Sequence, residues 1–122
     1  MAQPGTHHLR VVQGDDYAWP VRFETRHADG STTPFSLEGQ LVQAQIRRRD
    51  ADTDAGAPPL ATLTVVVEDA LGGIVTLFLS SEDSTLLTGN ARWDLQLTRT
   101  SDDWTRTVLA GDVLVWREVT RV

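Results

Sequence analysis

The stretch Asn90-Ala91-Arg92-Trp93-Asp94-Leu95-Gln96-Leu97-Thr98-Arg99 (NARWDLQLTR) alternates strictly between apolar and polar side chains. Successive side chains of a β-strand point to opposite faces of the sheet. One face of this segment therefore holds Ala91, Trp93, Leu95 and Leu97, and the other holds the polar residues between them. The pattern predicts a strand with one face in the core and the other face in water or against a neighbour.

The same period-two alternation recurs along the chain, with Gly, Pro, Asp and Ser clusters between the apolar runs. It predicts strands at about residues 8–13, 17–25, 40–49, 60–68, 73–80, 90–99, 105–110 and 112–121. A turn at Ala110-Gly111-Asp112 is predicted between the last two strands. One short helix is predicted at about residues 81–87, with Ser80 or Ser81 as its cap and acidic residues in its first turn.

This series of strands predicts an all-β fold, with at most one short helix. We expect an antiparallel two-sheet β-sandwich of immunoglobulin-like type, and a partly open barrel is the alternative. The 122 residues suit one domain spanning residues 1–122. Residues 1–7 are expected to form a flexible or partner-ordered arm.

The composition argues against several classes of partner. The formal net charge is −6, which disfavours phosphate binding, so nucleic acid is not an expected partner. No cysteine is present, which excludes disulfides and thiolate metal sites. No window approaches the roughly 20 apolar residues of a membrane span. No signal peptide is recognised either, so synthesis in the cytoplasm is expected.

The stretch Gln13-Gly14-Asp15-Asp16-Tyr17 sets two adjacent carboxylates between apolar runs. Gly14 permits a positive φ, and both Asp side chains can bond back to the local backbone, so a turn is predicted rather than a catalytic site. Pro20 follows in the next strand and predicts an edge strand or a bulge there.

Chemistry-bearing motifs are sparse. Asp50, Asp52 and Asp54 alternate like the first three ligands of a calcium loop, but Ala55 replaces the turn glycine and Ala61 replaces the bidentate glutamate. They are a weak candidate calcium loop, and a solvated acidic loop is favoured. No local signature of a nucleophile or of a zinc hydrolase occurs. We therefore expect no enzyme activity, catalytic residue, cofactor or small-molecule substrate.

Several residues are candidates for contacts with a protein partner. Trp104 lies in a polar loop and is the least core-like of the four Trp residues. Trp116 lies on a strand with large side chains on both faces, one of which another subunit could cover. The cluster Arg47, Arg48 and Arg49 could grip phosphates or meet an acidic neighbour. Pro20 marks an edge that a neighbour could use.

The order of short motifs resembles that of small bacteriophage tail proteins. These motifs are Gln13-Gly14-Asp15-Asp16, Phe35-Ser36-Leu37-Glu38-Gly39, Val42-Gln43-Ala44-Gln45-Ile46-Arg47, Gly73-Ile74-Val75-Thr76-Leu77, Trp93-Asp94-Leu95-Gln96, Arg106-Thr107-Val108-Leu109-Ala110-Gly111 and Val119-Thr120-Arg121. Together they span nearly the whole chain. The nearest family is the N-terminal domain of the phage baseplate upper protein.

That resemblance implies an immunoglobulin-type β-sandwich that attaches receptor-binding parts to the tail tip, and it carries no catalytic residues. We expect a structural component of a tailed-phage virion, at the tail tip or baseplate, with copies of itself and other virion proteins as partners. Capsid decoration or head-to-tail joining is an alternative. An alternative of another class is a calcium- or carbohydrate-binding β-sandwich module, which would use the Asp50 to Asp54 loop and an exposed Trp.

Overall fold

The computed structural model describes residues 5–48 and 59–116 of the chain. Its elements in chain order are β1 (Gly5–Thr6), β2 (Leu9–Val12), β3 (Tyr17–Arg22), β4 (Glu24–Arg26), β5 (Thr32–Pro34), β6 (Gln40–Arg48), β7 (Ala61–Asp69), β8 (Ile74–Leu79), α1 (Ser81–Thr85), β9 (Ala91–Arg99) and β10 (Trp104–Trp116). The prediction of a mostly β chain with one short helix is confirmed.

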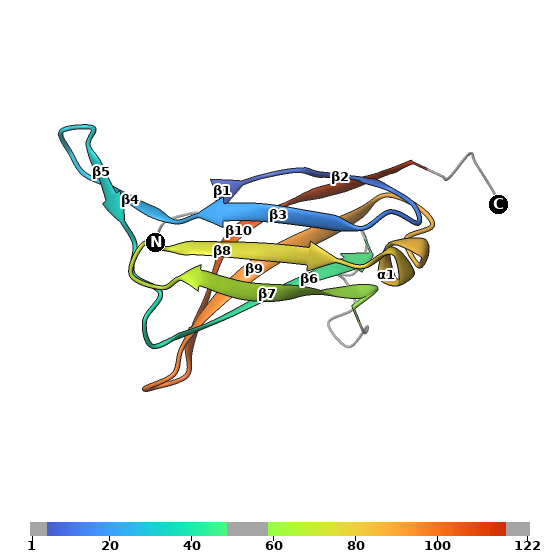
Figure 1. Cartoon of the computed structure of the whole chain (residues 1–122). Helices are drawn as coiled ribbons and strands as arrows, with labels where there is room; N and C mark the ends of the chain where they lie inside the picture. Colours follow the sequence, from blue (N-terminus) through green and yellow to red (C-terminus); the bar gives the residue numbers. More distant parts are fainter. Residues whose placement is uncertain (1–4, 49–58, 117–122) are drawn as a thin grey trace.

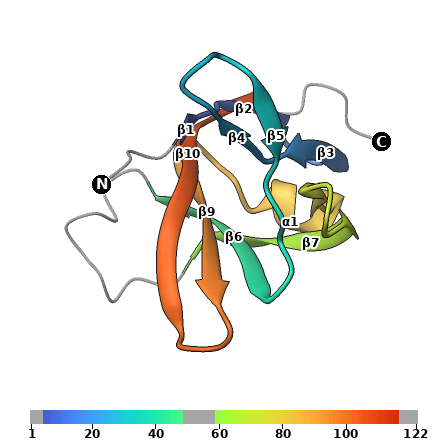
Figure 2. The ribbon, with the colours of Figure 1, turned by 90° about the vertical axis from the view of Figure 1, so that its left-hand side faces the viewer.

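Eight of these strands form one sheet, in the order β1-β10-β9-β6-β7-β8-β3, with β2 also paired to β10. The sheet has two halves that meet at strand β7. The start of β7 pairs with β6, and the rest of it pairs with β8. The sheet curls at this strand. Figures 1 and 2 show the result, with β3, β8 and β7 on one side of the core and β6, β9 and β10 on the other.

The sheet is mixed rather than purely antiparallel, which corrects the sequence prediction. Strands β1 and β2 both run parallel to β10, with Gly5 opposite Leu109 and Leu9 opposite Val113. Gly5 and Thr6, from the expected N-terminal arm, are therefore paired with the main sheet. The other ladders of the sheet are antiparallel.

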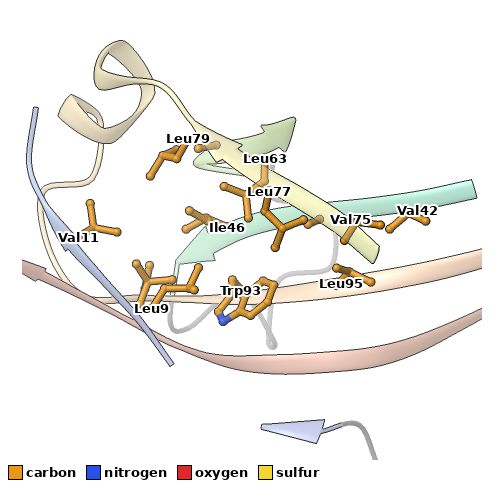
Figure 3. Close-up of a cluster of buried hydrophobic side chains, with 14 of the residues drawn as sticks. Leu9, Val11, Val42, Ile46, Leu63, Val75, Leu77, Leu79, Trp93 and Leu95 are labelled. Atoms are coloured by element: carbon orange, nitrogen blue, oxygen red, sulfur yellow. The ribbon is translucent and has the colours of Figure 1, made fainter. Parts of the chain in front are cut away.

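The core lies between the two halves and is built from the alternating faces that the sequence predicts. Trp93 and Leu95 of β9 face it, as do Ala44 and Ile46 of β6. Leu77 and Leu79 cover them from β8. Figure 3 shows Ile46, Leu77 and Trp93 in one cluster with their neighbours. The buried apolar residues are Leu9, Val11, Leu37, Val42, Ala44, Ile46, Ala61, Leu63, Val75, Leu77, Leu79, Leu87, Ala91, Trp93, Leu95, Leu97 and Val113.

The predicted turn at Ala110-Gly111-Asp112 is wrong, because β10 runs unbroken through it. Gly111 serves a close approach of two backbones instead: a Cβ at this position would lie 2.0 Å from the carbonyl oxygen of His7. The indole Nε1 of Trp93, which lies opposite Gly111, donates to the same oxygen at 2.7 Å. The missing side chain thus lets the segment between β1 and β2 lie against β10.

The strand predicted over residues 17–25 is also divided. Strand β3 ends at Arg22, and β4 turns away to pair with β5 in a separate hairpin. That hairpin closes at residues 27–31, where the Asp29 side chain accepts from the amide of Ser31. Strand β5 was not predicted, since Thr32, Thr33 and Pro34 are all exposed and show no apolar alternation.

Helix α1 confirms the predicted helix, and Ser80 is its cap, with its side chain accepting from the amide of Asp83. The turn before β3 has the predicted positive φ at Gly14, of 94°. The Asp16 carboxylate does not bond back to its own turn, however, but accepts from the amide of Ser81 at 2.6 Å. The turn is therefore fastened to the start of α1, which the sequence analysis did not predict.

Candidate interaction surface

The hairpin between β9 and β10 projects from the lower edge of the molecule, opposite the β4–β5 hairpin (Figure 1). The Arg99 guanidinium closes it with two hydrogen bonds to the Asp102 carboxylate, from Nε to Oδ1 at 2.9 Å and from Nη2 to Oδ2 at 2.7 Å. The amide of Trp104 donates to Asp102 Oδ1 at 3.2 Å. Asp103 takes a left-handed conformation, with φ of 58°, which Asp tolerates better than most residues.

These contacts favour the charged form of both partners. The hydrogen bond from Arg99 is the main reason that the pKa of Asp102 lies below its ordinary value, and the amide of Trp104 acts in the same direction. The same hydrogen bond raises the pKa of Arg99. The tip is therefore a closed ionic turn at neutral pH, although both side chains are well exposed to solvent.

Trp104 lies close to two guanidinium groups on this hairpin. The Arg99 guanidinium is 4.9 Å from the centre of the Trp104 ring system, and that of Arg106 is 5.5 Å from it. Arg106 also lies 5.2 Å from the ring centre of Phe35. Trp104 nevertheless remains 53% exposed. These four residues, Phe35, Arg99, Trp104 and Arg106, are called the Trp104 cluster below.

The segment before β6 supports the cluster from beside the hairpin. The amide of Phe35 donates to the carbonyl oxygen of Phe23 at 3.0 Å. Thr100, in the hairpin, donates from its amide to the carbonyl oxygen of Gly39 at 2.9 Å. Both strands of the hairpin also belong to the main sheet, so sheet hydrogen bonds hold the backbone that carries the exposed Trp104 ring.

Trp116 lies at the other end of β10 from Trp104. Twelve residue steps of extended chain separate them, or about 40 Å, so the fold does not bring these two candidates together. Trp116 is 51% exposed and lies opposite Val12, which is also exposed. The two form a smaller apolar spot next to the amide of Gln13, which donates to the carbonyl oxygen of Trp116.

The predicted arginine cluster lies on the outer face and end of β6. Arg47 is opposite Arg92 of β9, which is in turn opposite Asp112 of β10. Arg47 Nη2 also donates to Gln45 Oε1 at 2.8 Å. Arg48 is exposed beside Ala91, and Arg49 lies outside the described residues. These cross-strand neighbours on β6, β9 and β10 therefore include both charge signs.

Pro20 lies on β3, which is the last strand in the order of the main sheet. The prediction of an edge strand at Pro20 is confirmed. Because proline has no N–H group, it fits only where the backbone nitrogen is not needed by a ladder. Thr76 of β8 lies opposite it.

Asp50, Asp52 and Asp54 lie outside the described residues. Within residues 5–48 and 59–116, no group of three or more His, Asp or Glu side chains is arranged to hold a metal ion. No helix in that part of the chain is long and apolar enough to cross a membrane.

A hollow of about 360 Å³ lies where the β4–β5 hairpin leaves the main sheet, and none of the predicted contact residues that are described here lines it. Its lining residues are Arg22, Glu24, Thr32, Thr33, Pro34, Gly72 and Ile74. The predicted contacts lie elsewhere on the surface.

Sequence reasoning identified Trp104 but missed Phe35, Arg99 and Arg106 around it. A signal was present for two of them. Arg99 and Trp104 flank a four-residue polar loop, so they form the first cross-strand pair of the hairpin, and Arg106 follows on the same face two residues later. No local pattern linked Phe35 to Trp104, because Phe35 is far from the hairpin in the sequence.

No protein-family model matches the chain, and no curated protein matches it significantly in sequence.

Proposed function

We propose that this protein is a structural component of a tailed-phage virion, placed at the tail tip or baseplate, and that it works through subunit contacts rather than catalysis. The observation that carries the proposal is the Trp104 cluster, a large aromatic side chain held half-exposed on a projecting hairpin. The order of motifs described above, which resembles that of phage tail proteins, supplies the phage context.

An exposed Trp favours a protein contact for physical reasons. Trp and Arg are the residue types most enriched among those that contribute most to binding. The guanidinium groups of Arg99 and Arg106 already contact the Trp104 ring, so less side-chain freedom remains to be lost on association. Repetition in a symmetric ring would then make individually weak contacts effective together.

The same feature argues against the carbohydrate-binding alternative. A sugar ring that stacks on Trp needs an open aromatic face, and the guanidinium groups of Arg99 and Arg106, 4.9 and 5.5 Å from the ring centre, would compete with it for the ring. A partner with carboxylates or a carbonyl-rich edge fits the same cluster better, because it can accept from the N–H groups of Arg106 while it covers the ring.

We also propose that the curled sheet is a variant of the immunoglobulin-like sandwich of the baseplate upper protein family. Support comes from the two facing halves of the sheet and from the positions, on its strands and turns, of the quoted motifs that lie within residues 5–48 and 59–116. The parallel pairing of β1 and β2 with β10 would then be a feature of this variant.

The test is to locate the protein on particles. Tailed particles would be purified from a lysate of the phage that encodes the chain, labelled with an antibody against this domain, and imaged by electron microscopy. Label at the tail tip is expected. Label on the capsid or at the head-to-tail joint would contradict the tail-tip placement, and absence from particles would overturn the virion proposal.

A variant pair then tests the role of the Trp104 cluster. Trp104→Ala should lower the amount of protein incorporated per particle about tenfold or more, as expected for a residue central to an interface. Leu86→Ala is the matched control, since Leu86 is a similarly exposed apolar residue at the end of α1, and Figure 1 shows α1 far from the hairpin. Equal incorporation of the two variants would show that the Trp104 cluster is not part of the interface.

A further inference from the structure

The second half of β7 is an open edge of the sheet. Strand β7 pairs with β6 only from Ala61 to Leu63, and the two strands then separate. Beyond that point Thr64 to Val67 pair with β8 on one side. On the other side, no strand within residues 5–48 and 59–116 pairs with them. Their outward-facing N–H and C=O groups are therefore available to a further strand.

The Thr64–Val67 part of this edge lacks the usual protection against strand pairing, and the charged residues of β7, Glu68 and Asp69, follow it at the end of the strand. Thr64, Val65, Val66 and Val67 are all β-branched, and the run contains neither charge nor proline. Val66 is 41% exposed and Val67 is 43% exposed. Segments with this composition pair readily with other strands when they are exposed.

Two other edges of the main sheet, on β3 and β2, differ in this respect. Strand β3 carries Pro20, and the four-residue β2 carries the exposed Arg10. Proline, charge and short length are the means by which proteins block pairing at an edge. Of these three edges, the Thr64–Val67 part of β7 is the one that carries neither proline nor charge.

We propose that this edge of β7 pairs antiparallel with the same edge of a second copy of the chain, about a two-fold axis at Val66. In this register Val66 lies opposite Val66 of the second copy, and Val65 lies opposite Val67. Thr64 then lies opposite Glu68, so no two like charges face each other directly. The segment is its own complement, which is the requirement for an isologous dimer.

Pairing would join the β7-β8-β3 half of one copy to the same half of the second copy, giving one continuous sheet across the dimer. Its order would run β3-β8-β7 in one copy and β7-β8-β3 in the other, leaving the β3 edges with Pro20 at the outside. Three residues of the Trp104 cluster, Arg99, Trp104 and Arg106, lie on β9 and β10, which belong to the other half of the sheet. The dimer thus goes beyond the proposed virion function and does not depend on it.

The experiment uses the purified full chain alone. Sedimentation velocity would be measured over a range of about 1 μM to 1 mM, which covers the weak affinities expected of a short edge pairing. The wild-type chain should show a reversible monomer–dimer equilibrium. Val66→Lys should weaken that equilibrium about tenfold or more, because it places two Lys side chains opposite each other at the axis.

Leu71→Lys is the matched control, since it adds the same charge at a residue 67% exposed in the turn after β7. It should dimerise like the wild type. A wild-type chain that remains monomeric throughout would overturn the proposal, and so would a Val66→Lys variant that dimerises as well as Leu71→Lys. If the β7 edge pairs only with a different protein, the wild-type chain alone will remain monomeric, and the proposal will be overturned.

Hydrogen exchange keeps the test independent of any folding defect in the variant. In the wild-type chain, edge-facing amides within residues 64–68 should exchange more slowly as the concentration rises. Amides of β8 should not change, because they already face strands in the monomer. Exchange in residues 64–68 that is independent of concentration would overturn the proposal.

Discussion

The buried hydroxyl of Ser84 accepts a hydrogen bond from the amide of Gly14 at 3.0 Å, which joins helix α1 to a turn 70 residues earlier in the chain. Ser84 Oγ also lies 2.8 Å from the carbonyl oxygen of Asp15, to which it can donate. The Gln13 side chain reaches the carbonyl oxygen of Thr85 nearby. A buried polar side chain with every bond satisfied thus fixes the corner between β2 and β3.

Ser84→Ala should therefore destabilise the fold. The substitution leaves the amide of Gly14 without its partner, and an unpaired donor of this kind costs about 1–3 kcal/mol in the free energy of unfolding. Denaturant titration of wild type and variant measures this difference. Thr85→Ala is the control, because it removes a hydroxyl from the same helix whose one bond is to Ser81 in an exposed position. An equal loss in both variants would contradict a special role for Ser84.

Gly111→Ala should loosen the N-terminal segment from β10. A Cβ at this position meets the backbone of His7 far inside normal contact distance, so either β10 or the segment around His7 must move. Overpacking of this kind costs about 1–3 kcal/mol. The indole N–H of Trp93, which donates to the same carbonyl group, should then exchange faster with solvent, as followed by nuclear magnetic resonance.

Gly89→Ala is the control for this prediction. A Cβ there would meet no atom within 4 Å, and the residue does not adopt a positive φ. We expect its stability to match the wild type or slightly exceed it, because alanine restricts the unfolded chain. A Gly111→Ala variant as stable as Gly89→Ala, with unchanged exchange at Trp93, would show that the close approach is not required.

The hairpin tip should weaken in acid. The pKa of Asp102 is lowered below 3.8, chiefly by the hydrogen bond from Arg99. The ionic turn is therefore fully formed above that value, and it is lost as the pH falls through the pKa of the folded state. A carboxyl titration followed by nuclear magnetic resonance should show this lowered pKa for Asp102, and Arg99→Gln should raise it toward 3.8.

Asp29 provides an internal reference in the same titration. Its pKa is lowered by hydrogen bonds from Ser31, in the other hairpin, and not by Arg99. The Arg99→Gln variant should leave the pKa of Asp29 unchanged. A pKa of Asp102 that stays low in this variant would assign the shift to the amide of Trp104 instead.

Local patterns in the sequence were sufficient for most strands and for the helix. Alternation placed Trp93, Leu95 and Leu97 on the core face, and Ser80 was among the predicted caps. These features depend on residues close together in the chain. The polar face of β9 likewise lies outside, where Thr98 bonds Thr105 of β10.

The errors share a physical cause, which is contact between distant segments. Gly111 suggested a turn because glycine is common in turns, yet here it makes room for the backbone of His7, 104 residues earlier. Asp16 suggested a local bond, yet it accepts from Ser81. For the candidate site, Trp104 was found from its polar neighbours, whereas Phe35 became part of it only through the fold.

Pro20 gives the last prediction, because the structure changes its meaning. The sequence suggested an edge that a neighbour could use, but a proline at the middle of β3 removes a donor and so discourages pairing there. Since Pro20 cannot donate to β8, its nitrogen is expected to face the open side of the strand. Pro20→Val should restore the N–H group at that edge and increase self-association, seen as light scattering at a lower temperature on heating. Ala18→Val is the control, since it adds a similar β-branched side chain to the same outer face without a new donor. If both variants scatter alike, apolar surface rather than the restored donor drives association, and the protective role of Pro20 is wrong.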